Sequence, residues 1–204
     1  MKKSLLILPL VLLASALALS ACGGGSSSSS GGESGLDEAA IEEAIETAAT
    51  SNDPSKCTEV QTQNFNENET GKTGATALKT CEQKVEEGND QAESVTVTNV
   101  EEVEEGTATA IAEVEGSVMN GQAVAVVLKE EEGAWKLDEF MGFANFDPEA
   151  LGSALEELLN EEEGADATKV ACVAEGIEGM TEEEAEAMIF EKNEEGLEEI
   201  LAGC

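Results

Sequence analysis

The chain has 204 residues, with 45 acidic against 10 basic side chains and a formal net charge of −35 at pH 7. This charge excludes nucleic acid as a partner, because phosphate binding needs clustered Lys or Arg side chains. Histidine is absent, which excludes catalysis by Ser–His–Asp or Cys–His groups.

Residues 1–21 have the features of an export signal. Two lysines precede an apolar stretch at 5–19, which is shorter than the roughly 20 residues that a membrane span needs. The stretch ends in the sequence LSAC at 19–22, which resembles the lipobox of bacterial lipoproteins. The resemblance implies cleavage before Cys22, attachment of a diacylglyceryl group to its thiol, and anchoring at the extracytoplasmic face of a bacterial membrane. The alternative is an ordinary signal peptide followed by an unrelated cysteine.

Residues 22–35 follow as the lipidated cysteine and a tether composed almost entirely of Gly and Ser. Chains of this composition behave as random coils, and one of this length spans on the order of 20 Å. We therefore expect the tether to hold a folded domain clear of the lipid head groups.

The folded part begins with predicted helices. Residues 36–50 place four apolar side chains on one helix face (Ile41, Ala44, Ile45 and Ala48). Asp53 and Pro54 have the residue types of an N-cap and a first helical position, which predicts a second helix running to about Phe65. A third helix is expected at 76–87.

The segment between the second and third predicted helices is rich in Asn, Thr and Gly, which is typical of a loop. Asn66, Asn68 and Thr70 have the spacing of the first ligands of an EF-hand. The twelfth position is Ala77, however, where Ca²⁺ binding requires a bidentate Glu. The segment therefore predicts a turn, and no metal site is expected.

After residue 94 the apolar period changes from about 3.6 to 2, which is typical of strands. Residues 94–100 and 107–116 predict two strands, and GQAVAVVLKEEEGAWKLDEF at 121–140 predicts two more. The short connections favour an antiparallel meander. Helices followed by a run of strands indicate an α+β domain, which we place at 36–146.

Residues 147–204 predict a small helical C-terminal appendage. Pro148 begins one helix, residues 166–175 form another, and Thr181 with Glu184 has the spacing of a capping box that begins a third. A last apolar stretch precedes Cys204. A folded unit this small has marginal stability unless a covalent cross-link such as a disulfide holds it together.

Besides Cys22, the chain has four cysteines, an even number that indicates disulfides in an exported protein. Four cysteines allow three pairings. Proximity in the sequence favours Cys57–Cys81 and Cys172–Cys204. A zinc site is the alternative, but neither CxxC spacing nor histidine supports it.

The order of elements in 36–146, with the stretches VTVTNVEEVEEGTATAIAEVEG and EEGAWKLDEF, is similar to the NTF2-like (cystatin-like, SnoaL-like) group. The resemblance implies helices packed into the concave face of a curved antiparallel sheet, forming a cone. Phe65, Trp135, Phe140 and Phe143 would then line a pocket, although ordinary core packing is the alternative for these side chains. The group also has a short strand before its last helix, which the sequence between Phe65 and Ala75 lacks.

These features favour a non-catalytic binding or interaction module of the cell envelope, without a cofactor, whose partner is a small apolar ligand or an envelope protein. One alternative is an NTF2-like enzyme using a carboxylate in the cone, for which Asp138 and Asp147 are the aspartates near the end of the sheet. Another is a diffuse binder of divalent cations at the glutamate runs 130–132, 161–163 and 182–184.

Overall fold

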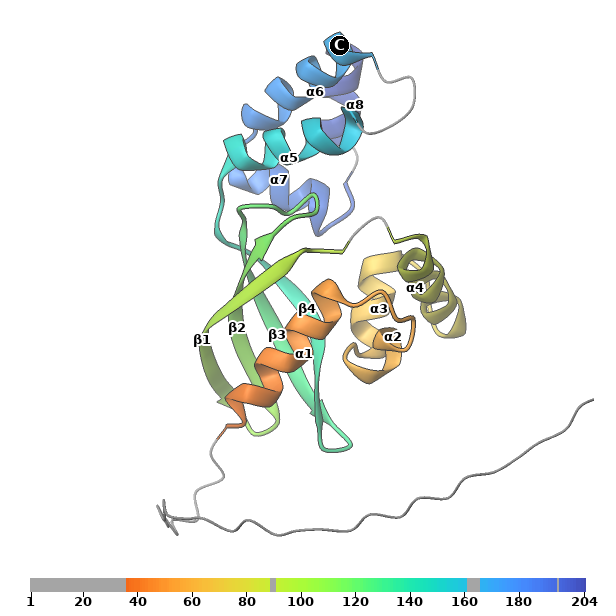
Figure 1. Cartoon of the computed structure of the whole chain (residues 1–204), viewed down its shortest axis with the longest axis vertical. Helices are drawn as coiled ribbons and strands as arrows, with labels where there is room; N and C mark the ends of the chain where they lie inside the picture. The colour runs from red at the N-terminus through yellow and green to blue at the C-terminus, as the bar shows by residue number, and fades with distance from the viewer. Residues whose placement is uncertain (1–35, 89–90, 161–165, 194) are drawn as a thin grey trace, which may run out of the picture. The chain divides into compact units, whose positions relative to one another are not determined.

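The computed structural model describes residues 36–88, 91–160, 166–193 and 195–204, so that the predicted signal peptide, Cys22 and the Gly/Ser tether lie outside the described residues. Within the described ranges the chain forms eight helices and one four-stranded antiparallel sheet, which confirms the predicted α+β class (Figure 1).

Four helices precede the sheet: α1 (Glu38–Thr50), α2 (Lys56–Glu59), α3 (Gln63–Thr70) and α4 (Ala75–Glu87). The α1 and α4 helices agree with the predicted ranges. The prediction of a single helix from Asp53 to Phe65 is wrong, because the helical conformation is interrupted between α2 and α3. The predicted loop after Phe65 is also wrong, since α3 continues to Thr70.

The break between α2 and α3 has a tertiary cause. The Thr62 backbone N–H donates to the Leu137 carbonyl at 2.8 Å, and the Leu137 N–H donates to the Val60 carbonyl at 2.9 Å. These bonds form a parallel bridge at Gln61 and use backbone groups that a continuous helix would need. The Thr62 hydroxyl then accepts from the Phe65 N–H at 3.0 Å and caps α3.

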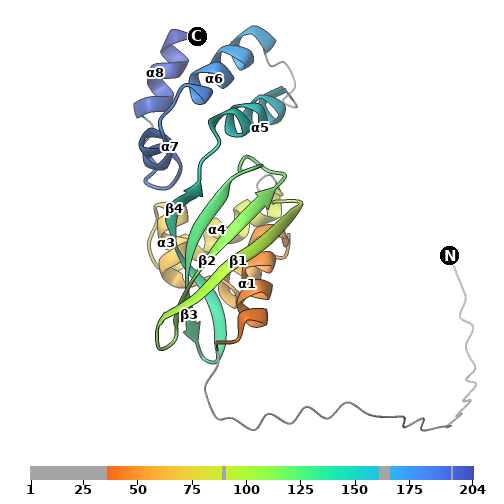
Figure 2. The same ribbon diagram turned by 90° about the vertical axis from the view of Figure 1, so that its left-hand side faces the viewer.

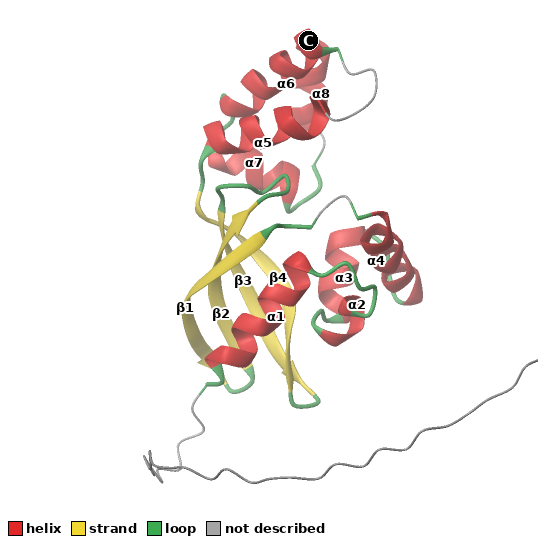
Figure 3. Ribbon diagram, in the orientation of Figure 1, coloured by secondary structure: helices red, strands yellow, loops and turns green. Residues whose placement is uncertain are grey.

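The sheet contains β1 (Ser94–Glu104), β2 (Thr107–Glu115), β3 (Ala123–Glu131) and β4 (Ala134–Asn145) in sequential order (Figure 3). All neighbours are antiparallel, as the short connections predicted. The register shifts within the β1–β2 and β3–β4 pairs, and such shifts bend strands and increase their twist. Between Phe65 and Ala75 the structure has the rest of α3 and a turn, with no strand.

The core lies between the helices and one face of the sheet. Alternating positions of β2 and β3 are buried on that face (Ala108, Ala110, Ala112, Val124, Val126 and Leu128). The predicted apolar stripe of α1 packs against them. Figure 2 shows α1, α3 and α4 behind the sheet, so these helices cover one face only.

Four helices follow the sheet: α5 (Pro148–Asn160), α6 (Ala167–Glu178), α7 (Glu182–Ile189) and α8 (Glu195–Gly203). The predicted capping box at Thr181 and Glu184 is confirmed, with both of its reciprocal bonds formed. The Gln122 side chain fixes the start of α5, because its amide exchanges two hydrogen bonds with the backbone of Asp147, at 2.8 and 3.0 Å.

The α7 helix contacts the sheet through an aromatic cluster and one carboxylate. The ring of Phe190 lies 5.5 Å from Phe140 and 5.0 Å from Phe143 between centroids. The Glu186 carboxylate accepts from the Phe143 backbone N–H at 2.9 Å. A backbone N–H of β4 thus has an acceptor on α7.

Both predicted disulfides are present, Cys57–Cys81 and Cys172–Cys204. The first joins α2 to α4 and is buried with Val85 in a small cluster of its own. The second joins α6 to the residue that follows α8. Each disulfide links elements near in sequence whose own packing is limited.

Candidate functional site

A cavity of about 380 Å³ lies between the sheet and the helices that cover it. Its walls come from α1, α3, α4, all four strands, the β2–β3 connection and the segment that follows α7. Most of the side chains that line it are apolar (Ile45, Ala48, Ala49, Phe65, Val85, Val95, Ala112, Val114, Val118, Met119, Val124, Val126, Leu137, Phe140, Ile189 and Phe190). A volume of this size accommodates a small organic molecule.

The local sequence explains why the cavity is apolar. In β2 and β3 every second residue faces the helices, and these residues are Ala or Val at Ala112, Val124 and Val126. Alanine in β2 leaves space that larger side chains would fill. The Phe65 and Phe140 rings, with centroids 5.1 Å apart, form one wall.

Of the four aromatic residues that the sequence assigned to a pocket, two line the cavity and two do not. Phe65 and Phe140 line the cavity. Trp135 and Phe143 are buried in the main core and do not belong to the cavity lining. Phe190, which the sequence reasoning did not select, lines the cavity through its position after α7.

Asn66 is the most deeply buried polar residue of the lining, with 3% of its surface exposed. Its side-chain nitrogen donates to the Cys57 carbonyl at 2.7 Å and to the Thr62 carbonyl at 2.9 Å. Its Oδ1 atom is buried and has no hydrogen-bond partner in the described structure. Buried polar atoms almost always have partners, so this oxygen requires an explanation.

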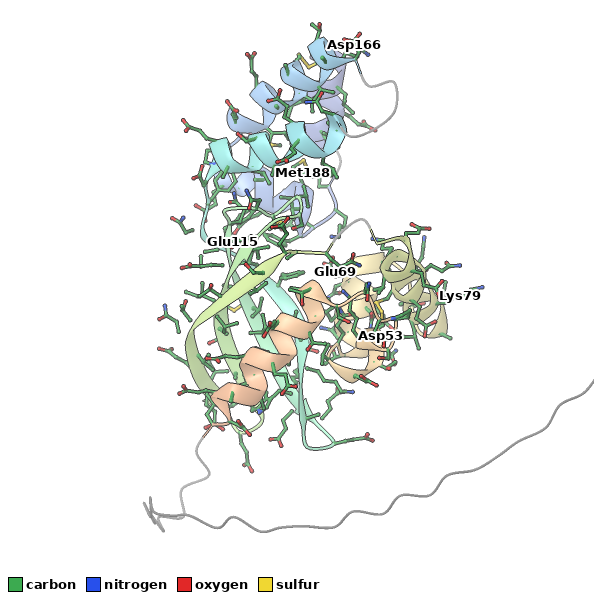
Figure 4. All side chains as sticks on the ribbon, viewed as in Figure 1. Asp53, Glu69, Lys79, Glu115, Asp166 and Met188 are labelled. Atoms are coloured by element: carbon green, nitrogen blue, oxygen red, sulfur yellow. A yellow bond between two sulfur atoms is a disulfide. The ribbon has the colours of Figure 1, made fainter. Side chains whose placement is uncertain are left out.

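Three of the four charged side chains of the lining, those of Lys56, Glu69 and Lys192, are engaged with protein atoms at the edge of the cavity, and Lys84 of α4 is the fourth. The buried Lys56 ammonium donates to the Ala48 and Ser51 carbonyls at 2.9 and 2.7 Å, at the C-terminal end of α1. Lys192 lies 3.3 Å from a carboxylate oxygen of Glu69, and Figure 4 shows Glu69 on α3. Among the described lining residues Glu69 is the sole carboxylate.

The aspartates considered for catalysis lie outside the cavity lining. The Asp138 carboxylate is buried, accepts the Thr62 hydroxyl at 2.7 Å and pairs with the Lys129 ammonium at 2.6 Å. The hydrogen bond to Asp138 raises the pKa of Lys129 above its ordinary value. Asp147 is exposed, and its carboxylate accepts from the Ala150 N–H at 3.0 Å. Both carboxylates therefore have local structural partners.

The glutamate runs at 130–132 and 182–184 are exposed on the surface, and the run at 161–163 lies outside the described residues. No group of three or more acidic, cysteine or histidine side chains is placed to hold a metal ion in the part of the chain that the structure describes. Figure 4 shows charged side chains such as Lys79 projecting outward from the helices.

The sequence predicted a loop at Asn66, because the segment after Phe65 is rich in Asn, Thr and Gly. The structure places it on the buried face of α3. A weak signal was available, since Thr62, Phe65 and Asn66 have helical spacing and a threonine N-cap.

Comparison with protein-family models, with curated proteins and with solved structures finds no match to this chain. Within the described ranges, none of the helices combines the length and the apolar character required to span a membrane.

Proposed function

We propose that the folded part of this protein binds a small, mainly apolar molecule without chemically changing it. The observation that supports the proposal is the cavity of about 380 Å³ beneath the sheet, with walls made largely of aliphatic and aromatic side chains. Small-molecule sites typically have this volume range and an apolar lining with a few polar groups.

A catalytic role receives less support from the lining. An NTF2-like enzyme using carboxylates would need an acid or base with a suitable pKa within reach of the substrate. The described lining offers Glu69, which is paired with Lys192. Binding is therefore the better interpretation.

We also propose that the domain is a member of the NTF2-like group. Support comes from an antiparallel meander covered on one face by helices that precede it, with the cavity between these layers. The bridge at Gln61 stands where an additional strand would extend the sheet beyond β4. The helices α5–α8 would be an addition to that domain.

Binding can be tested with the neutral fluorescent probe N-phenyl-1-naphthylamine, whose emission rises in apolar surroundings. Ala112 lines the cavity, whereas its near neighbour Ala125 belongs to the other face of the sheet. We expect Ala112→Phe to abolish probe binding because the new ring fills the cavity, and we expect Ala125→Phe to bind as the wild type does. Equal loss in both variants, or no binding by the wild type, would contradict the proposal.

We propose further that the protein is a lipoprotein held at the extracytoplasmic face of a bacterial membrane through Cys22, on the basis of the LSAC sequence at 19–22 and the Gly/Ser tether. We expect Cys22→Ala to remain unprocessed or to leave the membrane fraction, with Cys57→Ala/Cys81→Ala as a control that stays anchored. A Cys22→Ala variant processed and sedimenting like the wild type would place the anchor elsewhere.

A further inference from the structure

The charged side chains of the cavity lining reverse the charge balance of the chain. In the whole sequence acidic side chains outnumber basic ones by 45 to 10. The described lining instead holds three lysines, Lys56, Lys84 and Lys192, and one glutamate, Glu69. A lining that followed the composition of the chain would be acidic. The reversal indicates that this part of the protein favours negative charge in a molecule that it contacts.

The charged and the apolar side chains come from different walls of the cavity. Every side chain that β1–β4 contribute to the lining is apolar, as at Val95, Val124 and Leu137. The three lysines and the glutamate come from α2, α3, α4 and the segment after α7. A molecule in the cavity therefore contacts an apolar wall on the side of the sheet and charged groups on the side of the helices.

Two of these lysines lie at the opening of the cavity. Lys84, in the last turn of α4, and Lys192, after α7, line the cavity and are also exposed to solvent. A side chain with both properties lies where the cavity meets solvent. Lysine packs its apolar stem along such a surface and keeps its ammonium group in water. An anionic head group at the opening could therefore contact an ammonium group and keep part of its hydration.

Lys84 is the lysine that the protein leaves available at this opening. The Lys56 ammonium donates to two backbone carbonyls. The Lys192 ammonium lies 3.3 Å from a carboxylate oxygen of Glu69 and donates to the Ile189 carbonyl at 2.8 Å. Among the described residues, none forms an ion pair or a hydrogen bond with the Lys84 ammonium.

The net charge of −35 opposes the approach of an anion, but this repulsion acts over a longer distance than the contact with Lys84. At an ionic strength of about 0.15 M the Debye length is about 8 Å, so that exposed charges farther away are largely screened. A carboxylate that accepts a hydrogen bond from an ammonium group also gains a charge-assisted bond, which is stronger than a neutral one. For a bound anion the contact with Lys84 therefore outweighs the distant acidic surface.

We propose that the ligand is a fatty-acid anion, whose single apolar chain lies in the cavity against the sheet and whose carboxylate is bound by Lys84 at the opening. This inference rests on the proposed function, because it names the class of molecule that the cavity selects. The apolar walls, including Phe65 and Phe140, contact the chain of the ligand.

The test uses three ligands with the same decyl chain: the anion decanoate, neutral decanol and the cation decylammonium. Their affinities for the wild-type protein are measured at pH 7 and about 0.15 M NaCl by displacement of N-phenyl-1-naphthylamine, at concentrations that form no micelles. We expect decanoate to bind at least about fivefold more tightly than decylammonium. The net charge of the chain alone would favour the cation, so this order of affinities reports the local site.

Lys84→Gln removes the positive charge, and Lys79→Gln is the matched control, because Lys79 is exposed on the same helix and lies outside the lining (Figure 4). We expect Lys84→Gln to weaken decanoate binding about fivefold and to leave decanol binding unchanged. Lys79→Gln should change neither affinity, and Lys84→Arg should retain decanoate binding. A purely structural role of Lys84 would alter the thermal midpoint and leave the ratio of the decanoate and decanol affinities unchanged.

Two results would overturn the role of Lys84 while decanol binding leaves the proposed function standing. One is equal weakening of decanoate binding by Lys84→Gln and Lys79→Gln, which would be an effect of net charge. The other is a wild-type protein that binds decylammonium as tightly as decanoate. Failure of all three ligands and of the probe to bind overturns the proposed function as well.

Discussion

Removal of the Cys172–Cys204 disulfide should release α8 and leave the sheet folded. None of the described residues of α8 is buried, so little packing holds this helix in place. Ile200 lies against Gly176 of α6, at a position where any side chain would collide with it. The disulfide is therefore the strongest link between α8 and the rest of the protein.

The magnitude follows from the length of chain that becomes free. If α7 stays folded, the released segment is about 15 residues long, and the entropy of closing such a loop is worth about 3 kcal/mol. The free energy of local opening of α8 should fall by about this amount, which is about a hundredfold in the opening equilibrium constant. Removal of Cys57–Cys81, with a sequence separation of 24, should instead cost about 3.5 kcal/mol of global stability, since that disulfide is buried with Val85.

Amide hydrogen exchange distinguishes the two outcomes residue by residue. In Cys172→Ala/Cys204→Ala, we expect protection to fall about a hundredfold in α8 and to persist in β2 and β3. In Cys57→Ala/Cys81→Ala, we expect protection to fall throughout the sheet. If loss of Cys172–Cys204 lowers protection in β2 and β3 as much as in α8, the reasoning that α8 opens locally is refuted.

Three further predictions concern stability. Thr62→Val should lower the free energy of unfolding by about 2–3 kcal/mol in urea denaturation, because it removes the cap of α3 and one donor to the buried Asp138 carboxylate; a change below about 0.5 kcal/mol would contradict this. The Thr181 backbone N–H, and then the Thr181 hydroxyl, lower the pKa of Glu184. The ionised Glu184 carboxylate therefore stabilises the folded state at a pH above the ordinary pKa of 4.5. This stabilisation is lost as the pH falls through the lowered pKa that Glu184 has in the folded state. The advantage of wild type over Glu184→Gln in thermal midpoint should accordingly shrink between about pH 6 and pH 3, and a constant difference would argue against it. The thermal midpoint should also rise as NaCl increases from about 0.01 to about 1 M, because screening reduces repulsion within a chain of net charge −35; a single stoichiometric Ca²⁺ site with sub-micromolar affinity would contradict the diffuse interpretation of this charge.

Much of the fold could be predicted from local sequence, where the physical cause lies within a few residues. The stripe of Ile41, Ala44, Ile45 and Ala48 predicts α1 because helical spacing alone brings these side chains to one face. The Thr181 and Glu184 pair predicts the start of α7, since both capping bonds form within three residues. Two local disulfides could be expected because each pair lies within one predicted region.

The chain between Val60 and Asn66 shows what only the tertiary structure decides. Pairing with Leu137, far away in the sequence, breaks the predicted helix at Gln61. A new helix, α3, begins after this interruption at Gln63. Its starting point places Asn66 on the buried face of the helix.

The cavity depends on tertiary structure for the same reason. Phe65, Phe140 and Phe190 meet through the packing of α3, β4 and the segment after α7, whereas Trp135 packs in the core away from the cavity. Sequence alone determined the acidic charge, the types of most elements and the disulfide pairs, because these depend on composition and on neighbouring residues. Contacts between residues distant in the sequence decide where the helix is interrupted, that Asn66 is buried, and which side chains form the walls of the cavity. These contacts stabilise the protein only after folding has brought the residues together.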